Sequence, residues 1–197
     1  MHYISDILFW ISTGLFVPVI VLLIYFFCRA LMLAGSFFGQ YLDRQRIIKQ
    51  VQPDIDMLST DNVNELADKL PAKSRSLFVQ YLKQLLAASG HPQMDKIIAD
   101  YENAADKDLA ISKTLTKMGP MLGLMGTLIP MGPALVGLST GDIASMAYNM
   151  QVAFATTVVG LFSSAVGFAT QQAKQRWYIS ELNNLEYIAN LIKSQHE

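Results

Sequence analysis

Several hydroxyl side chains lie within a long apolar stretch, and they are the groups of this sequence best suited to handle an ion or a polar ligand. Between Met118 and Gln172, the only formally charged side chain is Asp142. Five of the hydroxyl residues lie well away from the polar turn and from the ends of the stretch: Thr127, Thr156, Thr157, Ser163 and Ser164. Grouped hydroxyls can solvate a channel or receive a partner's polar group. A lone Thr in a membrane helix more often bonds the carbonyl four residues before it, so each hydroxyl alone is weak support for a channel.

The same stretch lacks a side chain that could itself carry a proton. Proton relays through membranes use Asp, Glu or His, because the relay group must gain and lose the ion. The two apolar segments of the stretch contain none of these residues, and Asp142 lies in the polar turn between them. If this chain conducts protons, we therefore expect the carrier to lie on another polypeptide.

The sequence shows no pattern of an enzyme, a metal site or a cofactor site. Cys28 is the only cysteine, and the three histidines are scattered without ligand spacing. The glycines between Gly119 and Gly126 lack the lysine of a phosphate-binding loop. The net charge of −1 gives no indication of nucleic-acid binding. We therefore expect no catalytic residues, no metal and no cofactor.

Small residues recur at steps of three and four along both apolar segments, which places them on one side of each predicted helix. The first stripe consists of Gly119, Gly123, Gly126, Pro130, Pro133 and Gly137. The second consists of Ala153, Thr156, Gly160, Ser163, Gly167 and Thr170. Bulky residues such as Phe154 and Val158 lie on the opposite side. Such stripes indicate close helix packing in lipid, and facing stripes that carry hydroxyls also suit the wall of a pore.

Composition and segment length predict an all-α integral membrane protein. Of the 197 residues, 52% are hydrophobic and only 16% are charged. A bilayer is crossed by about 20 apolar residues in a helix. Three segments meet this requirement, at about 7–28, 119–139 and 147–172. The first lacks basic residues before its apolar core, so we expect a retained anchor rather than a cleaved signal peptide.

The distribution of cations predicts the orientation of the spans. All 15 Lys and Arg residues lie at Arg29 or later, on the two regions that three spans place on one side of the membrane. The N-terminal hexapeptide and the turn at 139–146 contain none. By the positive-inside rule, the middle region and the C-terminal tail are cytoplasmic, and the N-terminus lies outside.

The middle region predicts a small cytoplasmic bundle of four or five short helices. We expect the first helix to continue past its span as far as Pro53, with further helices at about 61–70 and 73–89. The last of these ends at Gly90 and His91-Pro92. From Pro92 an apolar pattern, with only Asp108 out of place, predicts an unbroken helix into the second span. The acidic residues of this helix are predicted to form a solvated face.

The third helix is predicted to continue to Lys193, with an apolar seam suited to self-association or to packing on the bundle. The seam consists of Leu182, Leu185, Ile188, Ala189 and Ile192. The domain organisation is then a periplasmic N-terminus with the first span (1–34), a cytoplasmic helical domain (35–117), a two-span hairpin (118–173) and a C-terminal helix (174–197).

Two short motifs resemble the MotA/TolQ/ExbB proton channel family. These are LGLMGT (Leu122–Thr127) and AFATTVVGL (Ala153–Leu161), separated by a short turn and preceded by one span and a cytoplasmic region. The three-span layout is similar to that of TolQ and ExbB rather than to four-span MotA. The resemblance implies a pentamer around a single-span partner of the ExbD, TolR or MotB type, which carries the ion-binding Asp.

The resemblance also implies roles for particular residues of this chain. Thr127 and Thr157 would belong to a polar ring beside the partner's Asp, and we add Thr156 and Ser164 to the predicted ion pathway. Where the family often has a Glu, this chain has Val152, and Pro130 and Pro133 make the second span unusually rich in proline.

Our hypothesis is a stator subunit that couples the flow of H⁺, or of Na⁺, to mechanical work in an inner-membrane motor. An alternative is a non-conducting oligomeric scaffold that presents the cytoplasmic helices to soluble partners. A third hypothesis is a subunit of a substrate transporter, which a neighbouring ATPase gene would favour.

Overall fold

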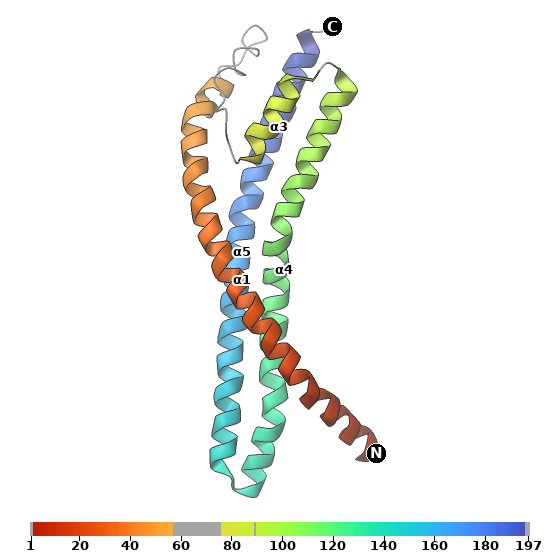
Figure 1. Cartoon of the computed structure of the whole chain (residues 1–197), viewed down its shortest axis with the longest axis vertical. Helices are drawn as coiled ribbons and strands as arrows, with labels where there is room; N and C mark the ends of the chain where they lie inside the picture. Colours follow the sequence, from red (N-terminus) through yellow and green to blue (C-terminus); the bar gives the residue numbers. More distant parts are fainter. Residues whose placement is uncertain (1, 57–75, 89, 196–197) are drawn as a thin grey trace. The chain divides into compact units, whose positions relative to one another are not determined.

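A computed structural model describes residues 2–56, 76–88 and 90–195. Within these residues the chain forms helices and no strand, so the predicted all-α fold is confirmed. The helices are α1 (His2–Asp56), α3 (Leu77–Leu86), α4 (His91–Thr140) and α5 (Ile143–Gln195) (Figure 1).

Three of these helices, α1, α4 and α5, are long and apolar enough to cross a membrane. Each contains one of the three predicted spans and continues beyond it. The unbroken helix predicted from Pro92 into the second span is confirmed, because α4 is continuous over 50 residues. The third helix likewise remains helical to Gln195.

The chain divides into two compact units, which are described separately. Unit 1 comprises the chain up to Gly35 together with Ile111–Gln171. Unit 2 comprises Ser36–Ala110 together with the chain from Gln172 onward.

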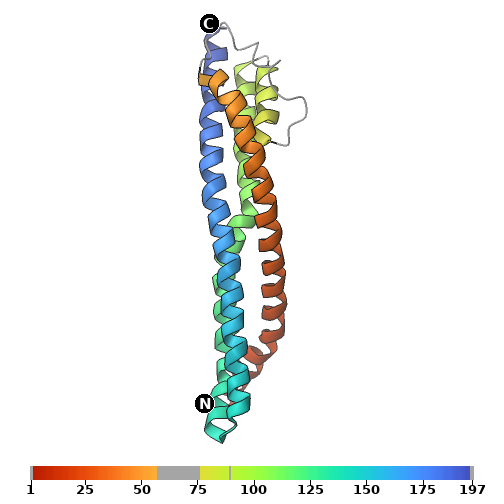
Figure 2. The same ribbon diagram turned by 90° about the vertical axis from the view of Figure 1, so that its left-hand side faces the viewer.

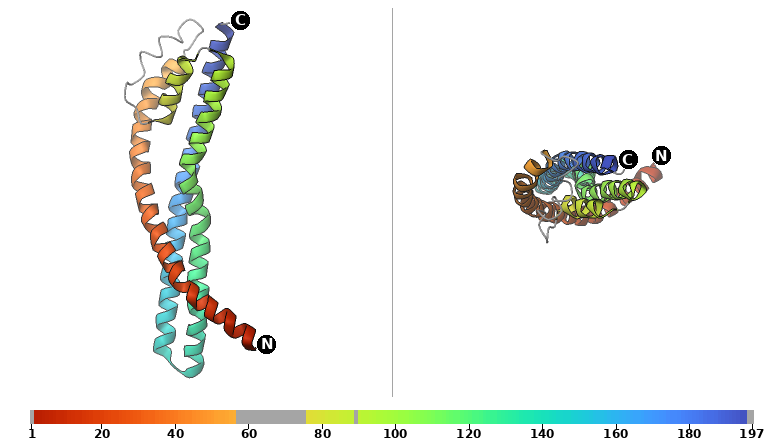
Figure 3. Two further views of the ribbon diagram at one scale, coloured as in Figure 1. Left: turned by 45° about the vertical axis from the view of Figure 1, so that its right-hand side comes forward. Right: turned by 90° about the horizontal axis from the view of Figure 1, so that it is seen from above.

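The centre of unit 1 is an antiparallel pair formed by α4 and α5, which lie side by side in two perpendicular views (Figures 1 and 2). A tight turn joins them, as the left-hand view of Figure 3 also shows. Gly141 adopts a φ of 80°, a conformation that glycine tolerates and that other residues rarely adopt. Asp142 then caps α5, because its Oδ1 accepts a hydrogen bond from the Ser145 amide at 3.0 Å.

The first helix packs on this pair through a few positions only. Val19 and Leu23 are buried against Leu122, and Ala30 and Leu33 are buried against Leu115. Many other apolar side chains of α1 are exposed, as expected for a helix whose remaining surface faces lipid.

Unit 2 has a core of large side chains from α3, α4 and α5. The fully buried members are Val79, Leu82, Leu85, Met94, Tyr101, Leu185 and Ile188. The predicted apolar seam of α5 therefore packs on the helical bundle of its own chain, which was one of its two expected uses.

Several predicted boundaries of the cytoplasmic helices were wrong. In the described part of unit 2, only α3 is a separate short helix, and the other members of the bundle are extensions of α1, α4 and α5. The first helix passes Pro53 and ends at Asp56, and α3 is shorter than the predicted 73–89. The helix predicted at 61–70 lies outside the described residues.

Candidate functional site

The α4–α5 contact in unit 1 is built on glycines that allow the two backbones to touch. A Cβ atom added at Gly160 would lie 2.7 Å from the Gly119 carbonyl oxygen and 2.9 Å from the Gly123 Cα. A Cβ added at Gly167 would lie 2.9 Å from the amide nitrogen of Thr116. Because backbone atoms cannot move aside as a side chain can, these positions require glycine.

The two predicted stripes face each other in this contact. All six members of the α5 stripe are buried, and so are the members of the α4 stripe except Pro133, which is half-buried. On the opposite side of α5, Phe154 and Val158 are 64% and 66% exposed. The stripes therefore pack the helices within one chain, while the bulky faces remain available to lipid or to other chains.

The residues predicted for the polar ring differ in burial within the α4–α5 contact. Thr156 is buried, and its hydroxyl lies 2.6 Å from the position that a Gly126 Cβ would take. Thr127 and Thr157 are half-buried, so each retains an accessible edge. Thr127 donates to the Leu124 carbonyl at 2.7 Å, and Thr157 donates to the Ala153 carbonyl at 3.1 Å.

Ser164 forms a hydrogen bond between α4 and α5 that the stripe pattern did not indicate. Pro120 lacks an amide hydrogen, so it leaves the Thr116 carbonyl without its usual donor four residues later in the helix. Ser164 Oγ, on α5, donates to this carbonyl at 3.0 Å. The bond crosses the helix pair and satisfies a group that would be costly to leave unpaired in a membrane.

Pro130 and Pro133 remove the usual donors of the Gly126 and Ile129 carbonyls in the same way. Among the hydrogen bonds of the described residues, no side chain donates to either carbonyl. The second span is thus continuous as a helix but lacks the usual backbone hydrogen bonds from the fourth following residue to these two carbonyls.

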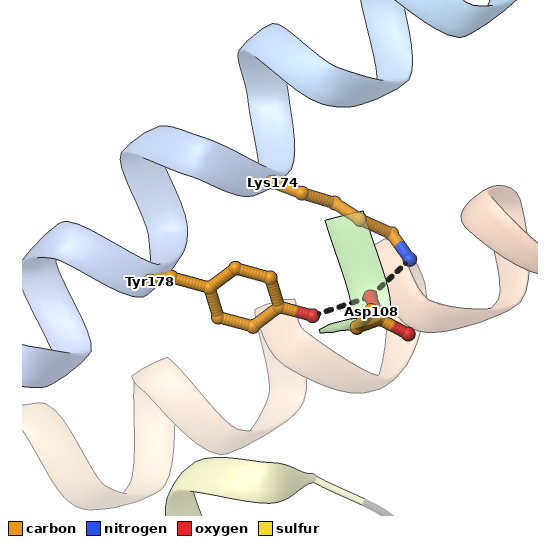
Figure 4. A network of polar contacts seen from close by, with 3 residues as sticks. All are labelled: Asp108, Lys174 and Tyr178. Atoms are coloured by element: carbon orange, nitrogen blue, oxygen red, sulfur yellow. Dashed lines mark hydrogen bonds and ion pairs between the residues drawn. The ribbon is translucent and has the colours of Figure 1, made fainter. Parts of the chain in front are cut away.

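Unit 2 contains a polar cluster on α4 and α5, which we call the Asp108 cluster: Asp108, Lys174 and Tyr178 (Figure 4). Lys174 Nζ lies 2.7 Å from Asp108 Oδ2, and the Tyr178 hydroxyl donates to the same oxygen at 2.6 Å. The Lys174 side chain is 2% exposed. Asp108 was the one residue out of place in the apolar pattern of this helix, and this pairing explains how a buried lysine is accommodated.

A second cluster of unit 2 joins its three long helices around Glu181. Arg44 Nη2 of α1 lies 3.4 Å from Glu181 Oε1, and the Tyr101 hydroxyl of α4 donates to Oε2 at 2.7 Å. The Arg44 guanidinium stacks on Trp177, which also stacks on Phe37.

Burial determines the proton affinities around Glu181, which lies beyond the predicted third span. Burial raises the pKa of the Glu181 carboxyl, while the hydrogen bond from Tyr101 and the Arg44 cation oppose this shift. Burial also raises the pKa of Tyr101 above its ordinary range, and the neighbouring Glu181 carboxylate adds to the effect. The pKa of Tyr178 is likewise raised, by burial and by its bond to Asp108, so Tyr101 and Tyr178 both remain hydrogen-bond donors.

Sequence reasoning missed the partners in these two clusters. No sequence pattern assigned a polar partner to Lys174, Glu181 or Tyr101. The break in the apolar pattern at Asp108 was the available signal. Among the described residues, no group of His, Cys, Asp and Glu side chains is arranged to hold a metal ion.

These features define a class of protein, namely a helical membrane protein with three candidate spans, two of which form an uncharged helix pair that carries hydroxyls. The chain belongs to the MotA/TolQ/ExbB proton channel family, whose sequence profile matches residues 74–186, more than half of its length. It is therefore a multi-pass membrane protein and a subunit of an ion-conducting complex. No curated protein matches the chain.

Proposed function

We propose that the chain is the stator subunit of an inner-membrane motor, in which a homopentamer surrounds a single-span partner that carries the ion-binding Asp. Ion flow, of H⁺ or alternatively of Na⁺, past that Asp drives mechanical work. The chain acts by conduction rather than by enzymatic catalysis. Its N-terminus lies outside, and unit 2 and the C-terminus lie in the cytoplasm.

One observation carries this proposal: the two apolar segments of the helix pair, 118–141 and 143–172, contain no Asp, Glu or His, and within them the hydroxyls of Thr127 and Thr157 keep an accessible edge. A partner's carboxylic acid needs hydrogen-bonding groups beside it when it crosses an apolar region. Hydroxyls at the edge of the α4–α5 contact meet this need without competing with the partner for the ion.

The test replaces Thr127 and Thr157 by valine, singly and together, because valine keeps the shape of threonine and removes the hydroxyl. We expect ion-driven work in cells to fall at least about tenfold in the double variant. The matched control is Thr13→Val on α1, where the hydroxyl also bonds a carbonyl of its own helix, that of Phe9, at 2.9 Å. Oligomer mass, measured on the purified complex, should be unchanged in every variant.

The competing hypothesis is a scaffold that oligomerises through its glycine stripes. These stripes are used for packing within the chain, so a scaffold would have to oligomerise through other surfaces. A scaffold predicts that the double valine variant works normally, whereas substitutions on the surface of unit 2 abolish function. Full activity of the double variant with normal assembly would reject the stator proposal.

A further inference from the structure

We propose that the part of α1 that belongs to unit 2 is a releasable strap, which detaches from α5 and rebinds while the subunit works, and that Arg44 sets the balance between the two states. We call residues 36–45 of α1 the strap. The inference rests on the proposed function and adds to it a movement within unit 2.

The strap lies outside the apolar core of unit 2. Among the described residues, neither the core nor the partly buried apolar side chains packed against it include a residue of α1. None of the described side chains of the strap is buried, and Phe38, Tyr41 and Leu42 are exposed. Detachment of the strap therefore loses little of the hydrophobic stabilisation that holds α3, α4 and α5 together.

The strap contacts α5 through an aromatic and ionic patch. Phe37 stacks on Trp177 with 5.3 Å between the ring centroids and 7° between the ring planes. Tyr41 packs on the same ring at 5.9 Å. The guanidinium carbon of Arg44 lies 4.7 Å from the centroid of that ring, and its Nη2 lies 3.4 Å from Oε1 of Glu181. Hydrogen bonds between two charged groups are ordinarily about 2.7–2.9 Å long, so this ion pair is a weak contact.

Arg44 is poorly satisfied while the strap is bound. Its Nε and Nη1 atoms are inaccessible to solvent, and neither has a hydrogen-bond partner among the described residues. Burying charged N–H donors without acceptors costs free energy, and release returns these donors to water. The carboxylate that is left behind keeps a partner, because the Tyr101 hydroxyl donates to Oε2 of Glu181 at 2.7 Å. The ring stacking that favours the bound strap is therefore opposed by the burial of Arg44.

A hinge for this movement lies where the strap begins. Gly35 and Ser36 form the kind of glycine–serine pair at which long helices kink, and Gly39 follows one turn later. A Cβ added at Gly35 or Gly39 would meet no atom of a described residue within 4 Å, so close packing explains neither glycine. Each glycine weakens the helix relative to alanine. These positions allow α1 to bend at the strap.

The experiment measures how accessible Trp177 is to acrylamide, a neutral fluorescence quencher, in the complex purified with its natural partner. Trp10→Phe makes Trp177 the only tryptophan of this chain. The same complex with Trp177→Phe in addition gives the background fluorescence of the partner. The strap variant combines Arg44→Met with Glu181→Gln, which removes both charges, keeps an apolar side chain over Trp177 and retains an acceptor for Tyr101.

We expect acrylamide quenching of Trp177 to fall at least about twofold in the strap variant, because replacing a buried ion pair by neutral groups removes the cost of burying Arg44. Ion-driven work in cells should fall at least about fivefold, because a strap that stays bound blocks a conformational step. The matched control is Lys193→Met with Asp95→Asn, an ion pair of the same unit whose side chains are 25% and 65% exposed. The control should change neither quantity, and the oligomer mass should be normal in both variants.

Two results would overturn the strap. Quenching of Trp177 that is unchanged or increased in the strap variant would mean that Arg44 does not favour release. Reduced quenching with full ion-driven work would mean that release plays no part in the work of the subunit.

The threonine variants test the proposed function separately. If they lose work while the strap variant works normally, the strap is wrong and the stator proposal stands. If only the strap variant loses work, the stator proposal fails and the strap remains. If neither set loses work, both proposals fail.

Discussion

The two units of this protein achieve close helix packing by opposite means. In unit 1, α4 and α5 touch because side chains are missing, with Gly160 opposite Gly119 and Gly123. In unit 2, α3, α4 and α5 are held by large side chains such as Leu82, Leu85 and Leu185, each of which is fully buried. In lipid, apolar side chains gain no free energy from the hydrophobic effect when helices associate, so packing there depends on close approach of the backbones. In water, the hydrophobic effect drives large apolar side chains together. The contrast between the two units therefore follows from the two solvents that surround them.

The two units also treat polar groups differently. Unit 1 uses hydroxyls, most of which bond carbonyls of their own helix, as Thr157 and Ser163 do. Unit 2 uses charged pairs and tyrosines that join different helices, as in the Asp108 cluster. Charges are costly inside lipid, so the segment assigned to the membrane retains only neutral groups.

The largest effect is expected in unit 2 when a core side chain is made smaller. Leu185→Ala should lower the free energy of unit 2 opening by about 2–5 kcal/mol, because it removes buried apolar contacts and leaves a cavity. Hydrogen exchange of the α3 backbone amides in lipid nanodiscs measures this free energy. Leu42→Ala, at a position that is 46% exposed, is the control and should change it little. Equal effects of the two variants would argue against the core described for unit 2.

In unit 1, the reverse change should be harmful, namely making a residue larger. Gly160→Ala should destabilise the helix pair by about 1–3 kcal/mol, since the added methyl group meets backbone atoms. Thermal unfolding in nanodiscs provides the measurement. Gly14→Ala is the matched control, because a Cβ there meets nothing within 4 Å. If Gly160→Ala were as stable as Gly14→Ala, the helices would not be in contact as described.

A smaller effect concerns the hydrogen bond between Ser164 and the Thr116 carbonyl. Ser164→Ala should cost about 1 kcal/mol by leaving that carbonyl unpaired. Pro120→Ala restores an amide donor within α4, so Ser164→Ala should cost much less in the Pro120→Ala background. A double-mutant cycle of thermal unfolding measures this coupling. Additive effects would mean that the serine does not compensate for the proline.

The smallest effect is a pH dependence of stability that is expected in unit 2 and not in unit 1. Because the folded-state pKa of Glu181 is raised above its unfolded value, its contribution to stability is present below about pH 4.3 and is lost as pH rises through the raised pKa. Glu181→Gln should remove this part of the pH dependence of α3 hydrogen exchange. The pH dependence of unit 1 unfolding should be the same in Glu181→Gln as in the wild type. If the pH dependence of α3 hydrogen exchange were also the same in the two proteins, the role of Glu181 would be contradicted.

The sequence was sufficient to predict features that depend on one helix at a time. The inward face of each span followed from the spacing of residues such as Gly119, Gly160 and Gly167. The continuity of α4 followed from its apolar period. These features could be predicted because the period of an α-helix is fixed, so spacing alone decides which residues share a face.

Contacts between helices could not be predicted, because they depend on the register of two helices. Lys174 and Asp108 are 66 residues apart in the chain, and Ser164 and Thr116 are 48 apart. Nothing in the local pattern of either partner identifies the other. The division of Thr156 and Thr157 into buried and accessible positions is also a property of the pair, although the two residues are adjacent.

The bond between Ser164 and Thr116 has a consequence for the biogenesis of the protein. Its acceptor is made 48 residues before its donor, so the second span must leave the ribosome with a bare carbonyl. That carbonyl acquires its partner only when the third span has been synthesised and has folded back. The nascent hairpin is therefore expected to enter the bilayer as one piece rather than as two successive insertions.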